Sequence, residues 1–225
     1  MFSRFKQRST ELERLDTGDF TPAEYAKWQR EMRVIHRLFG EMRALRNSLG
    51  RAFLESGEKN VSVLDVGAGS GELLRSLTSQ IEGAFLVGVE LNADAVRTIR
   101  DAGLNSLRAD AMKLPFADDC FDYVFCSLFL HHLDDGPAMT MLGEMSRVAR
   151  KRIFVIDLNR SPVAYYFYKL VGGLFLQPFT LEDGALSILR SRPPDELTDL
   201  AERAGLKDIR VQHSRANRLI LSGTK

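Results

Sequence analysis

The sequence predicts an α/β fold with a doubly wound, mostly parallel, seven-stranded sheet. From residue 61 onward, apolar strand-like runs alternate with helical segments, a pattern that favours parallel strands joined by right-handed crossover helices. A glycine-dense turn at residues 67–71 separates the first strand from its helix. Polar residues also fall at or just beyond several strand ends, where such sheets bind ligands: Asp65, Glu90, Asp110, His131 and Asp157.

The predicted elements follow one another in a regular order. The first strand starts at Val61 and ends in Asp65, and a helical pattern opens at Glu72. The remaining strands are expected at 84–90, 104–109, 121–126, 153–156, 209–213 and 218–222, and the helices at 93–102, 137–149 and 193–204. The last two strands directly follow the terminal helix, so we expect them to form an antiparallel hairpin at the edge of the sheet.

A helical region precedes the sheet. Thr21 and Glu24 form a capping-box pattern, with a proline at the first helical position, and this predicts a helix starting at Thr21. Apolar residues recur at steps of three and four from Tyr25 to Leu49. This spacing predicts one apolar face along one or two helices, broken near Gly40, that packs on the rest of the chain.

Residues 161–190 interrupt the alternation. Within them, the strongly apolar stretch 163–179 carries one charge, Lys169. As a helix it spans about 25 Å, short of the roughly 30 Å hydrocarbon core of a bilayer, so it is not a membrane span. Two interpretations remain: a lid over an apolar substrate, able to touch a membrane surface, or a buried helix pair that completes the core. We therefore divide the chain into an N-terminal helical extension, residues 1–55, and a ligand-binding domain, residues 56–225. Within the domain, residues 161–190 are a lid insertion.

Composition narrows the class of protein. A chain of 225 residues suits one α/β domain with an extension, and a net charge of +1 gives no indication of nucleic-acid binding. Cys120 and Cys126 flank an apolar run and are expected to be core thiols, not disulfide or metal ligands. The first ten residues lack the apolar segment of a secretion signal, so we expect a cytoplasmic protein. The oligomeric state is left open.

The glycine turn suits one of two cofactor classes. Dinucleotide-binding turns have the order G-x-G-x-x-G, with a pyrophosphate at the helix N-terminus. Counted from Gly67, the third glycine position of that pattern is Glu72, whose carboxylate would repel a pyrophosphate. The order found here is D-x-G-x-G-x-G, starting at Asp65. Glu90 ends the second strand and can accept both ribose hydroxyls, which indicates an adenosine cofactor of either class.

Further motifs follow at a regular spacing. Residues 108–112 read RADAM, and residues 114–122 read LPFADDCFD. Together with the glycine turn, this order resembles the class I S-adenosylmethionine (SAM) methyltransferases over residues 61–160, and implies their Rossmann-like sheet, with N-terminal helices covering the cofactor and part of the substrate pocket. The SAM ligand carries an ammonium and a sulfonium, so an acid at the first strand suits it. The resemblance implies these cofactor-binding residues: Asp65, Gly67, Ala68, Gly69, Gly71, Glu90, Leu91, Asp110, Ala111 and Met112.

Beyond residue 160 the chain is similar to the small-molecule branch that includes the ubiquinone and menaquinone C-methyltransferases. It also resembles methyltransferases of phenolic lipids that act beside type III polyketide synthases, through the runs NRSP at 159–162 and EDGALS at 182–187. The resemblance implies transfer of a methyl group from SAM to an oxygen or carbon of a small apolar acceptor, a phenol or quinol. A non-catalytic SAM-binding module is the alternative, and a nicotinamide-dependent oxidoreductase is disfavoured by Glu72.

Two adjacent histidines are the candidate catalytic residues. His131 and His132 come just after the fourth strand, where the acceptor is expected. A phenol ordinarily titrates near pH 10, so a base near neutrality helps to remove its proton, and we expect His132 rather than His131 to be that base. The alternative is that both shape the pocket through hydrogen bonds. We expect no metal, because His131 stands where catechol-type enzymes place the first acidic ligand.

Overall fold

The computed structural model describes residues 3–38, 40–58, 60–81 and 83–225. Within these residues a seven-stranded sheet has the order β3-β2-β1-β4-β5-β7-β6. The strands are β1 (Ser62–Val66), β2 (Phe85–Glu90), β3 (Asn105–Arg108), β4 (Phe121–Ser127), β5 (Ala149–Leu158), β6 (Lys207–Ser214) and β7 (Arg218–Thr224). Strands β1 to β5 pair in parallel, whereas β7 is antiparallel to β5 and β6 to β7. The predicted fold class and the edge hairpin are confirmed.

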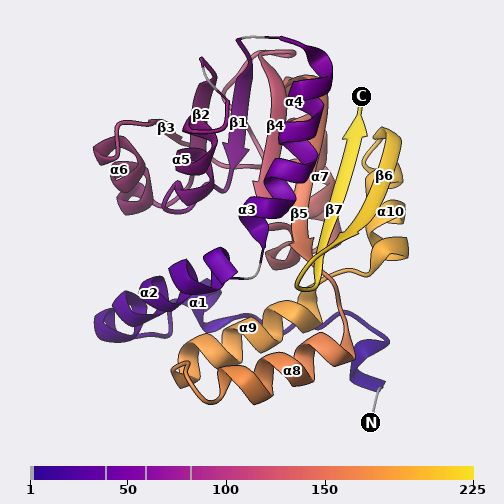
Figure 1. The fold of residues 1–225 in the computed structure, drawn as a ribbon. Coiled ribbons are helices and arrows are strands. Elements are labelled where there is room, and N and C mark those ends of the chain that lie inside the picture. The colour runs from indigo at the N-terminus through magenta and orange to yellow at the C-terminus, as the bar shows by residue number, and fades with distance from the viewer. Residues whose placement is uncertain (1–2, 39, 59, 82) are drawn as a thin grey trace.

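Helices cover both faces of the sheet because the central strands are apolar on both sides. In β4, Phe125 packs into one core layer and its neighbour Val124 into the other. The first layer lies under α3 (Glu41–Leu45), the helical turn η2 (Arg46–Gly50), α4 (Arg51–Ser56), α5 (Glu72–Thr78) and α6 (Ala93–Asp101). The second lies under α7 (Asp135–Val148) and α10 (Pro194–Arg203). Figure 1 shows α4 in front of the sheet and α7 behind it.

Four helices gather below the carboxyl ends of the parallel strands (Figure 1). They are α1 (Arg14–Thr17), α2 (Pro22–Leu38), α8 (Pro162–Gly172) and α9 (Pro178–Arg190), and we call this group the cap. Stacked aromatic rings join its two parts, since Phe179 of α9 lies 5.5 Å from Phe20 and 6.4 Å from Trp28, measured between ring centroids. The cap therefore combines the N-terminal region with the segment 161–190.

The expected capping box at the start of α2 is present. The backbone N–H of Thr21 donates to Glu24 at 2.8 Å, and the backbone N–H of Glu24 donates to the Thr21 hydroxyl at 3.2 Å. The helical region breaks at Gly40, which caps α3 with φ of 88°. Phe39, part of the predicted apolar face, lies outside the described residues. The domain boundary at residue 55 stays a prediction.

The segment 161–190 forms two helices instead of one continuous apolar helix. The residues between α8 and α9 turn the chain, and Pro178 starts α9. Helix α9 buries Phe179 and Ile188, whereas α8 leaves large apolar side chains exposed, among them Leu170 at 74%. Among the described residues, no helix is long and apolar enough to cross a bilayer.

Two further expectations need correction. Cys126 is buried, and burial raises its pKa, but Cys120 is exposed because it precedes β4 in a surface turn, so only one of the two is a core thiol. Strand β5 is also longer than the predicted 153–156. Its additional first residues pair with the start of β4, where Phe121 lies opposite Ala149.

Candidate functional site

A cavity of about 570 Å³ lies between the cap and the carboxyl ends of the strands. One wall is the glycine turn after β1, and the opposite wall comes from the cap and from the loop after β4. Apolar side chains from several elements line much of it: Leu15, Trp28, Met32, Ile35, Leu128, Val163, Phe167 and Ile188. Polar residues line it as well, among them Glu13, Asp65, Glu72, His131, His132 and Asp183.

The glycine turn at residues 67–71 has a backbone that a ligand can approach closely. Its N–H groups at Gly67 and Ala68 donate to the carbonyl of Val89, which ties the turn to the end of β2. Gly67 has φ of 73°, and a Cβ there would lie 2.9 Å from a ring carbon of Phe129, so a larger residue does not fit. Gly67, Ala68 and Gly69 line the cavity, as expected for a cofactor loop.

Two acids lie beneath this turn. Asp65, on β1, is 2% exposed and lines the cavity. Burial raises its pKa well above the ordinary value, and the negative charge of Glu90 raises it further. The Glu90 carboxylate accepts backbone N–H groups from Gly69 at 3.0 Å and from Leu91 at 2.8 Å, so it also holds the turn in place. This end of the cavity suits a positively charged ligand group.

The other expected cofactor residues, like Glu90, are not among the residues that line the cavity. Gly71 starts α5 with φ of 74°, and Leu91 is exposed. Asp110 accepts the backbone N–H of Met112 at 2.9 Å, while Ala111 is buried in the core. Their assignment as cofactor ligands stays a prediction.

Two of the three acids of the 114–122 motif, Asp118 and Asp122, make contacts within the fold. Asp122 accepts the backbone N–H of Ser62 at 2.9 Å and its hydroxyl at 2.8 Å, which joins the starts of β1 and β4. Burial opposes its ionisation, but the bonds from Ser62 and the charge of Lys151 lower its pKa overall. Asp118 lies at the surface and pairs with Arg147 at 2.8 Å. Both carboxylates therefore act in the fold, away from the cavity.

His131 lies in the short helical turn η3 (Leu130–His132) after β4 and is 3% exposed. Its Nδ1 is 2.6 Å from Asp157 Oδ1, and its backbone N–H donates to Asp157 Oδ2 at 3.0 Å. Burial opposes ionisation of Asp157, but the adjacent His131 imidazole and the backbone N–H donors lower the pKa of Asp157 overall. The ionised carboxylate fixes the proton of His131 on Nδ1 and leaves Nε2 as an acceptor on the cavity wall.

His132 lies closer to the surface and is oriented by a second aspartate. Its Nδ1 is 2.8 Å from Asp16 Oδ1, and the two imidazole rings are 4.3 Å apart. Burial opposes ionisation of Asp16, but the bonds from His132 and Arg190 lower its pKa to about 2. Glu13 completes the group: its Oε1 lies 3.9 Å from His131 Nε2, and burial raises its pKa to about 7. We call Glu13, His131 and His132 the inner cluster.

Three arginines hold the loop that carries the two histidines. Arg8 donates to the carbonyls of His131 and Leu133 at 2.8 and 2.9 Å, and Arg190 donates to the carbonyl of His132 at 2.7 Å. Arg192 donates to the carbonyl of Leu130 at 3.2 Å. Since each carbonyl of residues 130–133 accepts a guanidinium N–H, the histidine backbone is fixed by the N-terminal segment and by α9.

The sequence interpretation did not find the contribution of the N-terminal segment. Glu13 and Asp16 lie in a short run of mixed charge that gives no motif, and Arg8 and Arg190 are separated by 182 residues. One signal was present in the EDGALS run. A Cβ at Gly184 would lie 2.2 Å from the Tyr168 hydroxyl, and Asp183 accepts the backbone N–H groups of Arg14 and Leu15, so this run anchors α1.

Comparison with known proteins bears on the chemistry of this site. A family model described as a methyltransferase domain matches residues 63–152, from β1 into β5. A demethylmenaquinone methyltransferase of Roseiflexus sp. (strain RS-1) is 31% identical over 164 residues, which cover 65% of this chain and 68% of that protein. One from Shouchella clausii is 27% identical over 179 residues, covering 69% and 74% of the two chains.

Solved structures agree in fold. The magnesium protoporphyrin IX methyltransferase of Synechocystis PCC 6803, with bound SAH, has a TM-score of 0.65 at 16% identity, over 92% of this chain and 96% of that one. A SAM-dependent methyltransferase of Thermotoga maritima, described as a possible histamine N-methyltransferase, has a TM-score of 0.60 at 18% identity, over 90% and 95%.

Proposed function

The chain belongs to the class I SAM-dependent methyltransferases, and we propose that its acceptor is a small, apolar aromatic compound with a ring hydroxyl, a phenol or a quinol. SAM is the methyl donor. This family membership favours an enzyme over a non-catalytic SAM-binding module, and methyl transfer over nicotinamide chemistry. The finer proposal concerns what the enzyme methylates and which residues act.

The residues after β1 fit the donor. SAM supplies an electrophilic methyl group on a sulfonium, and it also carries an ammonium group. Two carboxylates, of Asp65 and Glu90, lie close enough to raise the pKa of Asp65, so a cationic ligand relieves their repulsion. We propose that Asp65 and Glu90 hold the donor, with the backbone of Gly67, Ala68 and Gly69 against it.

One observation carries the acceptor proposal: an apolar cavity has its polar inner cluster beside the glycine turn. Trp28, Met32 and Phe167 offer surfaces for an aromatic ring or an apolar chain. His131 and His132 offer acceptors for a hydroxyl proton. Two relatives are named demethylmenaquinone methyltransferases, and these names indicate a quinone-type acceptor. This supports the same class of acceptor for the present chain.

The proposed chemistry starts with loss of the hydroxyl proton at the inner cluster. The resulting oxyanion either attacks the methyl group directly, or places electron density on a neighbouring ring carbon, which attacks and then loses its hydrogen as a proton; in both routes S-adenosylhomocysteine leaves. Either route is an in-line displacement, so the protein contributes mainly by alignment and by excluding water. The ordered backbone of residues 130–133 and the Asp157–His131 pair serve that alignment, and for this reason we now place His131 ahead of His132.

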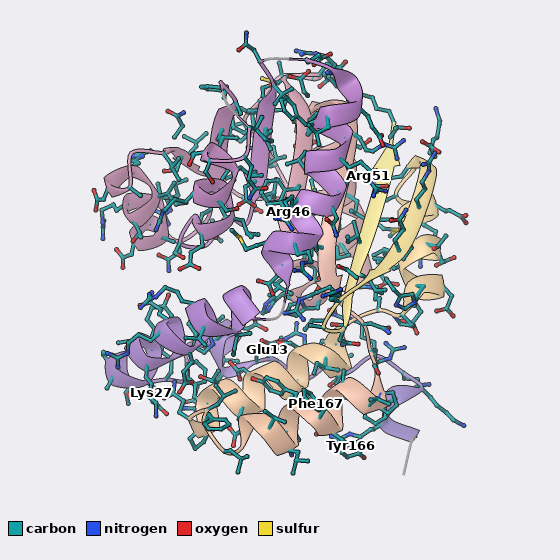
Figure 2. All side chains as sticks on the ribbon, viewed as in Figure 1. Glu13, Lys27, Arg46, Arg51, Tyr166 and Phe167 are labelled. Carbon is teal, nitrogen blue, oxygen red and sulfur yellow. The ribbon has the colours of Figure 1, made fainter. Side chains whose placement is uncertain are left out.

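We also propose that the cap touches a membrane surface from which an apolar acceptor enters. Val163, Phe167 and Leu170 follow one face of α8 at steps of four and three, and Leu174 and Phe175 extend it. Val163 and Phe167 line the cavity, yet Val163 is 80% and Leu174 73% exposed. A continuous apolar surface from the cavity to solvent favours a lipid environment. Figure 2 labels Phe167 and Tyr166 on α8.

The acceptor proposal is tested with labelled SAM and three compounds: a reduced short-chain demethylmenaquinone, an alkylresorcinol and water-soluble catechol. We expect label on one of the two apolar aromatics and little on catechol, with the site of methylation read by NMR. Transfer to catechol alone, or to none of the three despite SAM binding, would contradict the proposed acceptor class.

A further inference from the structure

The three side chains of the inner cluster converge on one point of the cavity wall. Each of Glu13, His131 and His132 offers one nitrogen or oxygen, and these atoms all lie within 4.8 Å of one another. Glu13 and His131 are each 3% exposed, and His132 is partly buried. Figure 2 places Glu13 between the cap and the sheet, so the group joins the two halves of the molecule.

Both imidazoles are arranged in the same way. Nδ1 of His131 meets Asp157 at 2.6 Å, and Nδ1 of His132 meets Asp16 at 2.8 Å. With each carboxylate accepting a hydrogen bond from Nδ1–H, the lone pair of each Nε2 is free. Histidines that bind metal ions commonly donate their other ring N–H to a carboxylate in this manner, which fixes the tautomer and raises the basicity of the ligand atom.

In the third group, Glu13, one carboxylate oxygen lacks a partner. Glu13 Oε1 is buried and makes no hydrogen bond to any described residue, and its nearest basic atom, His131 Nε2, is 3.9 Å away. That separation is too long for a hydrogen bond, but a shared ion between the two atoms would satisfy both. A buried carboxylate oxygen without a donor is costly unless a cation meets it.

We propose that Glu13, His131 and His132 bind a divalent transition-metal ion of the zinc class, with Asp157 and Asp16 as the outer carboxylates. Two imidazoles and one carboxylate suit Zn²⁺ and similar ions, whereas Mg²⁺ and Ca²⁺ prefer all-oxygen sites. Our expectation of no metal considered only acidic ligands after the fourth and fifth strands. The ligand set proposed now is a different one, because it contains two histidines and because Glu13 comes from the N-terminal segment.

The ion has a role in the reaction if the proposed function holds, and this part of the inference rests on that function. Three protein ligands leave a coordination position open to the cavity, where the hydroxyl of the acceptor binds. A bound dication would lower the pKa of the hydroxyl, so the acceptor would lose its proton to solvent as it binds, before the site closes for methyl transfer. With the ion bound, His131 and His132 would act as its ligands, and the role of proton acceptor that we propose for them without an ion would not be needed.

The site is tested by equilibrium dialysis of the chain, freed of metal and of any affinity tag, against Zn²⁺ alone. We expect one tightly bound ion per chain. Glu13→Gln keeps the shape of the side chain and should weaken Zn²⁺ binding at least 10-fold, as should Asp157→Asn through His131 (roughly 10- to 100-fold for such outer partners). His213→Ala removes an exposed histidine of β6 and should leave binding unchanged. Circular dichroism and Tm confirm that each variant is folded.

A second probe identifies the ligands. Co²⁺ bound at this site should give the visible d–d absorption of a nitrogen- and oxygen-ligated ion, and Glu13→Gln should abolish it. The site is overturned if folded Glu13→Gln and wild type bind Zn²⁺ equally, or if Co²⁺ shows the charge-transfer band of thiolate ligation at Cys120.

Because dialysis uses neither SAM nor acceptor, its result is separate from the acceptor assay. A chain that binds no ion but methylates the reduced quinone overturns the metal site and leaves the proposed function standing. A chain that binds one ion through Glu13 but methylates none of the aromatic compounds supports the site and overturns the acceptor class.

Discussion

The two walls of the cavity are built in different ways. The donor wall comes from one short stretch of the chain, within residues 65–73, and Glu90 of the adjacent strand holds it in place. The acceptor wall gathers Glu13, His131 and Asp157 from three distant parts of the chain. Local backbone geometry therefore shapes the first wall, whereas the second exists only when the cap docks on the sheet.

This difference implies that donor binding and methyl transfer can be separated by substitution. The glycine turn is held by backbone bonds to β2, which do not involve the cap. The histidine loop is held by Arg8 and Arg190, which belong to the cap and its N-terminal lead. Changes in the acceptor wall should then lower turnover while leaving SAM affinity nearly intact.

The largest expected effect is that of Asp157→Asn. Asparagine keeps the shape of the side chain but lets the proton of His131 move to Nε2, where the acceptor or ion must bind. We expect kcat to fall by about 10²- to 10⁴-fold, the range for loss of acid–base function, with the Kd for SAM within twofold. Steady-state assays with labelled SAM measure the first and calorimetry the second. The control is Asp118→Asn, at the surface, and an unchanged kcat in Asp157→Asn would refute the assignment.

Next in size is the loss of donor affinity in Asp65→Ala. A contact between a carboxylate and a charged ligand group contributes roughly 1.5–3 kcal/mol, so the Kd for SAM should rise about 10- to 100-fold. Calorimetric titration gives this value, with Asp101→Ala, an exposed acid on α6, as the control. Equal affinities in the two variants would show that Asp65 does not hold the donor.

A smaller change is expected at the outer face of the cap. Replacing Leu170 and Leu174 by serine removes part of the exposed apolar surface, so binding to phospholipid vesicles should weaken several-fold. Vesicle co-sedimentation measures it, and Leu54→Ser, which is 77% exposed on α4, provides the matched control. If Leu54→Ser weakens vesicle binding as much as the two serine substitutions in the cap, the membrane contact is not on α8.

The smallest expected effect concerns stability against pH. Since the pKa of Asp65 is raised in the folded chain, the unfolded chain loses this proton first as pH rises, and the free energy of unfolding then falls. This decrease in the free energy of unfolding is absent below the ordinary carboxyl pKa and complete above the raised pKa of Asp65 in the folded chain. Asp65→Asn lacks it, so its Tm should exceed that of wild type near neutral pH by a few degrees and match it in acid. Thermal melts without SAM across this range test the sign, and a lower Tm for Asp65→Asn at neutral pH would contradict it.

The donor wall is also the part that the sequence predicts well. Asp65, Gly67 and Glu90 are recognisable because their spacing is set by one strand, one turn and the next strand. The parallel part of the sheet follows from the alternation of strands and helices, and the edge hairpin from the two strand-like runs after the terminal helix. Two interpretations of 161–190 stay open from the sequence, because propensity predicts helices but not which of their faces is buried.

The acceptor wall was only half predictable. His131 and His132 follow a strand end and could be named, but the preference for His132 rested on no contact. The structure pairs His131 with Asp157 inside the molecule and brings Glu13 to it from 118 positions earlier in the chain, as the two residue numbers show. Such a contact depends on the packing of the cap, and local patterns in the sequence carry no information about it.

The most direct test of the two-wall account is a single-turnover experiment on His131→Ala and wild type, with labelled SAM bound before the acceptor is added. One sample then reports both the label retained by the protein and the label transferred. We expect equal retention and a transfer rate at least about 100-fold lower in His131→Ala. Transfer at the wild-type rate, or loss of bound SAM in the variant, would contradict the account.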